Sequence, residues 1–196
     1  RPLPQEPNPR DALSAEEMWP EVAVVIPTRN RADLLARCLR SLEGQKGIRT
    51  ELILVDNASD EPAVFDIYSD VCSRQSARIL SVGQPFNFAR MVNSGVREAR
   101  AELIVLLNND IELTNPLALA QMIAHASRPE VGVVGSRLLN PDGTVQHSGM
   151  HLRPGQNEKN PIAAPHALRA APRDAAGYLY QLQTIRNYQS VTGALI

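Results

Sequence analysis

Residues 22–30, with the sequence VAVVIPTRN, decide the fold class of this 196-residue chain. Five aliphatic residues are followed at once by a proline and three polar residues. Such a run suits a buried β-strand, whereas a membrane span needs about 20 apolar residues. The stretch therefore predicts a strand that lies inside a sheet and ends in a polar loop.

The same pattern recurs along the chain, and segments with helical periodicity fill the intervals. Further apolar runs of strand length occupy residues 52–55, 79–82, 103–107 and 131–134. Apolar stripes at helical spacing lie between the runs, in residues 34–42, 64–72, 88–99 and 117–124. Parallel neighbours need crossover helices, and those helices cover the sheet. The alternation therefore predicts an α/β fold with a mainly parallel sheet and helices on both faces.

Two short motifs predict where helices begin. Asn30 is placed to cap the first helix, and the carboxylate of Asp33 lies where it favours the helix dipole. Asn115-Pro116 has the residue order typical of a helix start, so we expect the fourth helix to open there.

The pattern changes after Gly135. Residues 137–140 and 144–147 flank Pro141-Asp142-Gly143, whose residue types suit a tight hairpin turn, and so predict an antiparallel pair. Residues 154–176 contain four prolines and few large apolar side chains, which predicts a long mobile loop. The apolar residues 191–196 predict a last strand.

The composition, 43% hydrophobic and 21% charged, is that of one globular domain. Residues 1–20 carry five prolines and predict an extended linker, which leaves residues 21–196 as the domain. The chain begins at Arg1 without an initiator Met. We therefore expect it to be a piece of a longer protein, with a domain that is incomplete at its C-terminus.

Charge and hydropathy exclude some classes of partner. The formal net charge is -1 and no basic cluster is visible, which disfavours binding to nucleic acid. No apolar run approaches the length of a membrane span, so none is expected in this chain. Cys38 and Cys72 are predicted to be buried free thiols in a reducing compartment. We expect a cytoplasmic protein, which other parts of the full-length chain could bring to the inner face of the membrane.

Polar residues follow three of the predicted strands, in residues 27–30, 56–60 and 108–110. Ligands of open α/β sheets bind beyond the carboxyl ends of the strands, so we expect these clusters to share one edge. No G-x-G-x-x-G follows the first strand and no P-loop motif occurs in the sequence. A dinucleotide-dependent dehydrogenase is therefore disfavoured, and bound phosphates would need another source of neutralisation.

Asp110 is the candidate ligand of a metal ion that would neutralise such phosphates. A carboxylate at a strand end, next to amide side chains, is a hard oxygen ligand suited to Mg²⁺ or Mn²⁺. The alternative for Asp110 and for Asp56 is a cap or a solvated loop charge, and Asn57 and Ser59 are also common turn formers. The presence of both carboxylates on one predicted edge favours the functional interpretation.

The histidines carry less information. His147 closes the predicted hairpin strand, where it either faces a cleft or caps the edge of the sheet. His147 and His151 have a helical zinc spacing, but Gly149 argues against a helix there, so a zinc site is not expected.

Taken together, five motifs resemble family 2 glycosyltransferases with the GT-A fold, in the bacterial branch attached to surface-polysaccharide enzymes. They are residues 24–31 (VVIPTRNR), 51–59 (ELILVDNAS), 87–95 (NFARMVNSG), 106–112 (LLNNDIE) and 141–149 (PDGTVQHSG). The resemblance covers residues 21–196.

The resemblance implies a role for each matching residue. Asp56 would accept a hydrogen bond from the base, and Asp110 would bind Mn²⁺ or Mg²⁺. Asn108 stands where the family has the first acid of D-x-D, so the metal would rest on Asp110 and the donor phosphates. Arg90 and His147 are candidates for the cleft. The residues implied to bind nucleotide are Pro27, Thr28, Arg29, Asp56, Asn93, Asn108 and Asn109.

The implied activity is inverting, metal-dependent transfer of a sugar, as in a hexosyltransferase. The donor would be a nucleotide-diphosphate sugar and the acceptor a glycan or a lipid-linked glycan. The family's catalytic base follows the strand that Thr192-Gly193-Ala194 resembles, and is expected beyond Ile196. This chain would then be mainly the donor-binding part. The alternative is a non-catalytic module that binds a nucleotide or a glycan within a larger protein.

Overall fold

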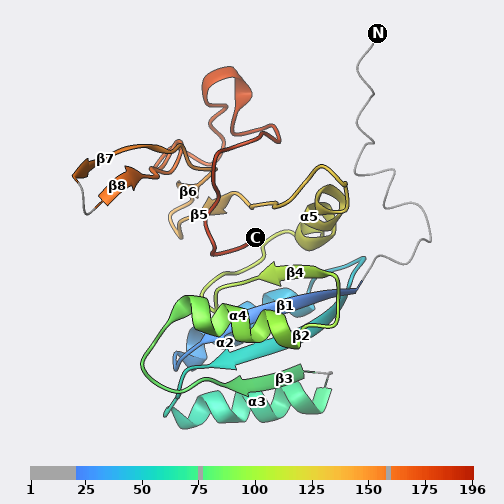
Figure 1. Cartoon of the computed structure of the whole chain (residues 1–196). Helices are drawn as coiled ribbons and strands as arrows, with labels where there is room; N and C mark the ends of the chain where they lie inside the picture. The colour runs from blue at the N-terminus through green and yellow to red at the C-terminus, as the bar shows by residue number, and fades with distance from the viewer. Residues whose placement is uncertain (1–20, 75–76, 158–159) are drawn as a thin grey trace. The chain divides into compact units, whose positions relative to one another are not determined.

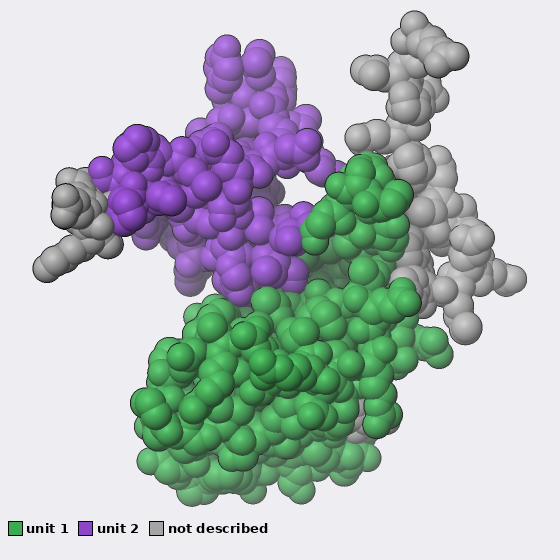
Figure 2. Space-filling model, viewed as in Figure 1, with its two compact units in different colours: residues 1–132 green, residues 133–196 purple. Residues whose placement is uncertain are grey.

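A computed structural model describes residues 21–74, 77–157 and 160–196 (Figure 1). The predicted linker, residues 1–20, lies outside the described residues. The chain divides into two compact units, residues 1–132 and 133–196, which Figure 2 distinguishes by colour.

Unit 1 is built on a four-stranded parallel sheet with the strand order β3-β2-β1-β4. Its strands are β1 (Glu21–Thr28), β2 (Arg49–Asp56), β3 (Ala77–Ser81) and β4 (Leu103–Leu106). Its helices are α2 (Ala32–Glu43), α3 (Pro62–Arg74), α4 (Phe88–Glu98) and α5 (Ala118–Ala126). The first four predicted strands and all four predicted helices are therefore confirmed.

Helices cover both faces of this sheet, as predicted. Alternate residues of β1 and β2 form one buried cluster with Met91 of α4, and α4 packs on both strands. The intervening residues, among them Ile26 and Leu54, are equally buried on the opposite face. Figure 1 shows α4 in front of the sheet and α2 behind it, and α2 packs against α3. Burial on two faces explains why these strands are continuous aliphatic runs.

Unit 2 consists of short antiparallel pairs. The strands β5 (Leu138–Leu139) and β6 (Val145–His147) pair around the predicted turn, where Gly143 has a φ of 84°. The amide of Gly143 donates to the carbonyl of Asn140. The pairing of β5 with β6 confirms the predicted hairpin. Glycine suits the turn because it adopts this backbone conformation without steric penalty. A 3₁₀ turn, η1 (Tyr178–Tyr180), follows later in the unit.

The predicted loop over residues 154–176 is wrong in part. The strands β7 (Arg153–Asn157) and β8 (Asn160–Ala163) form an antiparallel pair in its first half. Pro154 and Pro161 lie in these strands, since both strands of a two-stranded ribbon are edges and an edge tolerates a residue without an N–H donor.

Two other predicted strands are wrong. Residues 131–134 form no strand, and Val133 is 62% exposed. Residues 191–196 form no strand either. Val191 packs closely on Gly135, because a Cβ added to Gly135 would lie 2.7 Å from the Cβ of Val191. Aliphatic runs become strands only where a neighbouring strand offers a ladder.

Both predicted helix starts differ in detail. The cap of α2 is Arg31, with a left-handed φ of 57° and no side-chain hydrogen bond, so the prediction of Asn30 as the cap is wrong. Asp33 does lie in the first turn. Helix α5 begins at Ala118, and Asn115 acts just before it by accepting a hydrogen bond from the amide of Leu117.

The cysteines are free, as predicted, but only Cys38 is buried, and Cys72 is exposed. Among the described residues, every helix is too short or too polar to cross a membrane.

Candidate functional site

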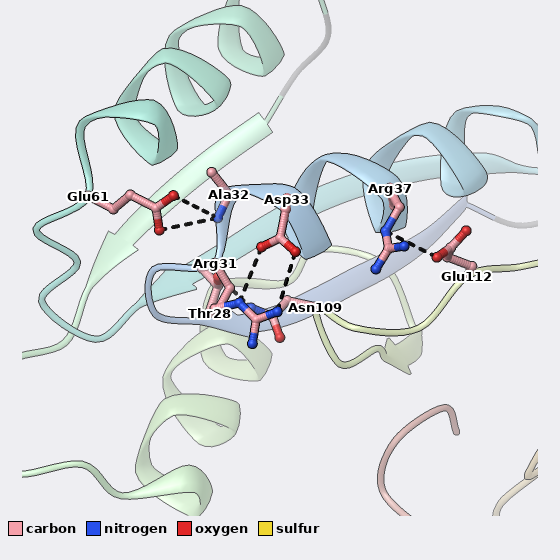
Figure 3. Close-up of polar contacts among 8 residues, drawn as sticks. All are labelled: Thr28, Arg31, Ala32, Asp33, Arg37, Glu61, Asn109 and Glu112. Carbon is pink, nitrogen blue, oxygen red and sulfur yellow. Dashed lines mark hydrogen bonds and ion pairs between the residues drawn. The ribbon is translucent and has the colours of Figure 1, made fainter. Parts of the chain in front are cut away.

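The loops after β1, β2 and β4 leave the sheet at the same edge, as predicted. The parallel register aligns Thr28 with Asp56, and the two side chains are only 3% and 6% exposed. The side-chain amide of Asn109, after β4, donates to the Thr28 hydroxyl at 3.0 Å (Figure 3). The ends of β1, β2 and β4 are thus joined by side-chain and backbone contacts into one polar edge.

Asp56 is held by two donors, one on each carboxylate oxygen. The Tyr68 hydroxyl, from α3, donates to Oδ1 at 2.8 Å, and the backbone amide of Ser59 donates to Oδ2 at 3.1 Å. Burial and the neighbouring Asp56 carboxylate raise the pKa of Tyr68 above its usual value. The hydroxyl therefore remains a donor. A carboxylate has about four acceptor positions, so Asp56 retains acceptor capacity for a ligand.

Asn30 links the loop after β1 to the loop after β2. Its side-chain Oδ1 accepts hydrogen bonds from the backbone amides of Asp60 and Glu61 at 2.9 and 3.2 Å, and its backbone amide donates to Ser59 Oγ at 2.8 Å. In the opposite direction, the Glu61 carboxylate accepts a hydrogen bond from the backbone amide of Ala32, which begins α2 (Figure 3). Asn30 has a φ of 53°, a left-handed conformation that asparagine adopts more readily than most residues.

The loop between β3 and α4 is attached to the same edge by Asn57. The fully buried Asn57 side chain donates to the carbonyls of Val82 and Gly83 at 2.8 and 3.3 Å. The Arg90 guanidinium donates to the carbonyls of Gly83 and Pro85. Arg90 therefore lies at the edge, but these carbonyls occupy part of its donor capacity. Asn93 lies one turn further along α4 and is exposed.

The loop after β4 carries the candidate metal ligand. The Asp110 side chain is exposed, and within the described residues it accepts no hydrogen bond and forms no ion pair. Asn108 is half-buried, and its carbonyl accepts from the Cys38 thiol at 3.5 Å. Burial, with Asp110 and Glu112 nearby, raises the pKa of Cys38 to about 12, so this thiol is not a nucleophile at neutral pH.

The donor set fits a divalent cation only with help from a ligand. The described residues contain no group of three or more His, Cys, Asp or Glu side chains placed to hold a metal. Asp110 offers one free carboxylate, and Mg²⁺ or Mn²⁺ commonly completes such a shell with waters and substrate phosphates. The neighbouring acid, Glu112, is already paired with Arg37 at 3.3 Å (Figure 3).

The other predicted site residues differ in exposure. Pro27 is half-buried and Arg29 is exposed. His147 belongs to unit 2 and is completely buried, where its Nε2 accepts from the amide of Gly149 at 3.1 Å. Its Nδ1 lies 3.4 Å from Nδ1 of His166, and burial with His166 nearby lowers the pKa of His147 to about 4.

The buried His147 makes unit 2 sensitive to acid. Its pKa is lower in the folded chain than the ordinary 6.5, so the unfolded chain binds the proton more tightly and stability falls as the pH drops below about 6.5. We expect a loss of about 2 kcal/mol between pH 8 and pH 5. Urea unfolding of the wild type and of His147→Gln at both pH values checks this, and an equal pH dependence in the two proteins would contradict it.

Sequence reasoning missed one member of the polar edge, Tyr68, and the pairing of another, Asn30. Tyr68 lies in an apolar helical stripe, and the signal available was that a buried tyrosine hydroxyl needs a partner. The pairing of Asn30 with residues about thirty positions away has no local signal, because it depends on the register of β1 against β2.

The sequence is similar to that of known glycosyl transferases. The sequence model of glycosyl transferase family 2 matches residues 23–182. The uncharacterized protein y4gI of Sinorhizobium fredii is 35% identical over 187 residues, which are 94% of this chain and 20% of that protein. The O-antigen biosynthesis protein RfbC of Myxococcus xanthus is 37% identical over 132 residues, 67% of this chain and 10% of that protein.

The fold is similar to that of a solved glycosyltransferase. The mannosyltransferase PcManGT of Pyrobaculum calidifontis, in complex with GDP-Man and Mn²⁺, superposes with a TM-score of 0.58 at 23% identity. The match covers 72% of this chain and 40% of that one. The chain thus spans a fifth or less of the two sequence relatives and less than half of the mannosyltransferase.

Proposed function

Because the chain belongs to glycosyl transferase family 2, we propose that its polar edge binds the nucleotide of a nucleoside diphosphate sugar. The predicted family is confirmed by the match over residues 23–182, and the predicted GT-A fold by the likeness to the mannosyltransferase. The longer protein would transfer the sugar, with inversion, to a glycan or lipid-linked acceptor of a surface polysaccharide. The relative named for O-antigen biosynthesis supports this choice of product.

The observation that carries the proposal is the buried Asp56 carboxylate, oriented by two donors at the edge where three loops meet. A carboxylate only accepts hydrogen bonds, so it would select the N–H groups of a nucleobase. The residues proposed to line the rest of the nucleotide site are Pro27, Thr28, Arg29, Asn93, Asn108 and Asn109.

Asp110 is proposed to hold Mn²⁺ or Mg²⁺ together with the diphosphate. Such an ion, when bound, would neutralise the charge that develops on the departing diphosphate. The carboxylate is exposed and unpaired among the described residues, which leaves it available for this purpose. The mannosyltransferase of similar fold is in complex with Mn²⁺, which supports a divalent metal.

No described acid stands out as the base that would deprotonate the acceptor. Glu112 is paired with Arg37, and Asp142 accepts from the amide and the hydroxyl of Thr144 in the hairpin turn. The proposal therefore assigns donor binding to this chain and expects the base beyond Ile196.

Calorimetric titration with UDP, GDP and dTDP, with and without Mn²⁺, tests the donor site. We expect one nucleotide to bind at least tenfold more tightly with Mn²⁺, and Asp110→Ala to remove that enhancement, because the carboxylate anchors the ion. Glu112→Gln is the matched control, since it removes an exposed acid two residues away and should keep the enhancement.

Failure of every nucleotide to bind the wild type would contradict the donor site. Binding by this chain, without sugar transfer by the longer protein under the same conditions, would favour the non-catalytic module.

A further inference from the structure

A buried pair, Tyr68 and Asp56, lies beneath the polar edge. We infer that Tyr68 is a positioning residue, whose hydroxyl orients the Asp56 carboxylate for recognition of a nucleobase. The inference rests on the proposed function and adds a residue from α3 to the nucleotide site.

The geometry holds the carboxylate on both sides. Tyr68 donates to Oδ1 at 2.8 Å, and the amide of Ser59 donates to Oδ2 at 3.1 Å and lies 3.4 Å from Oδ1. The terminal torsion of an aspartate is otherwise broad and roughly two-fold. Two donors on different oxygens remove that freedom, so the unused acceptor positions keep fixed directions.

The tyrosine is itself held in place. Its side chain is 7% exposed, and the ring of Phe65 packs edge-on against it with centroids 6.0 Å apart. Val64 and Val71, on the same face of α3, are also buried. The hydroxyl is therefore presented by a packed helix rather than by a mobile loop, which makes it suitable for orienting another group.

The hydroxyl remains protonated at any working pH, since burial and Asp56 raise its pKa. As a donor, it hydrogen-bonds to the carboxylate, acceptor form of Asp56. This is the form that would receive an N–H donor of a base, so the tyrosine acts through the carboxylate and need not touch the nucleotide.

The competing explanation is purely structural, because a buried hydroxyl needs a partner wherever it lies. The two explanations differ in which part of the ligand is affected. A positioning role concerns the base alone, whereas a general loss of packing would also disturb the loops proposed to hold the diphosphate.

The variant Tyr68→Phe distinguishes the positioning role from the structural one. Its affinities for the preferred nucleoside diphosphate and for pyrophosphate are measured by calorimetric titration, both with Mn²⁺. We expect the nucleotide to bind about 5- to 10-fold more weakly and pyrophosphate to bind as in the wild type. Tyr188→Phe is the matched control, because the Tyr188 hydroxyl is buried without a hydrogen-bond partner in the described residues, and it should change neither affinity.

Asp56→Ala gives a second test that does not depend on one variant. Adding Tyr68→Phe to Asp56→Ala should weaken nucleotide binding no further, since the tyrosine acts only through the carboxylate. Thermal unfolding of each variant confirms that it is folded.

Three results would overturn the inference. Equal weakening of nucleotide and pyrophosphate by Tyr68→Phe would show a structural role, and no weakening of either would show no role. Additive losses in the double variant would also contradict it. If the wild type binds pyrophosphate but no nucleotide, the proposed function itself fails, which is a different outcome from failure of Tyr68→Phe alone.

Discussion

Asp56→Ala should weaken binding of the preferred nucleoside diphosphate by about 100-fold, or about 3 kcal/mol. The substitution removes the acceptor proposed for the base. It also leaves the Tyr68 hydroxyl and the Ser59 amide without their partner in a buried place, which favours movement of the loop after β2. Calorimetric titration in the presence of Mn²⁺ measures the loss.

The matched control is Asp66→Ala, which removes an exposed acid from α3 and should leave the affinity unchanged. An Asp56→Ala protein that is folded and binds nucleotide as tightly as the wild type would contradict the role given to this carboxylate. Equal losses in both variants would point to net charge instead.

Gly95→Val should destabilise unit 1 by about 3 kcal/mol, a large share of the 5–15 kcal/mol typical of a whole protein. A Cβ on Gly95 would lie 2.4 Å from Val25 Cγ1 and 3.0 Å from Val55 Cγ2. Both valines lie in the buried core between the sheet and α4, so neither can move aside easily. Equilibrium unfolding in urea measures the change.

Gly132→Val is the control for this substitution, because nothing lies within 4 Å of a Cβ placed there. We expect it to change stability by less than about 0.5 kcal/mol. A Gly95→Val protein within about 1 kcal/mol of the wild type would show that α4 can shift away from β1 and β2.

Local sequence patterns predicted the location of the candidate site but not its internal contacts. Three polar clusters directly after aliphatic runs were enough to predict that residues 27–30, 56–60 and 108–110 share an edge, because parallel strands end on the same side. The hydrogen bonds between these residues could not be predicted from the sequence. Asn30 has the residue type of a helix cap, yet its side chain binds the amides of Asp60 and Glu61.

The strand and loop predictions that were wrong failed because pairing with another segment could not be predicted. Residues 131–134 have the composition of a strand but form none in the structure. Residues 154–176 have the prolines of a loop, but part of this segment pairs as β7 and β8. In each case the sequence reports a preference, and the outcome depends on whether another segment offers its backbone groups.

By itself, the sequence determined the parallel sheet, its covering helices, the hairpin around Pro141-Asp142-Gly143 and the edge that carries the polar loops. Each of these follows from local periodicity, from turn chemistry or from the alternation of strands and helices along the chain. Tertiary structure alone decided that Tyr68 reaches Asp56, that Asn109 reaches Thr28 and that His147 is buried beside His166. These contacts join residues 12 to 81 positions apart, and they exist only because packing and strand register bring those atoms within hydrogen-bond distance.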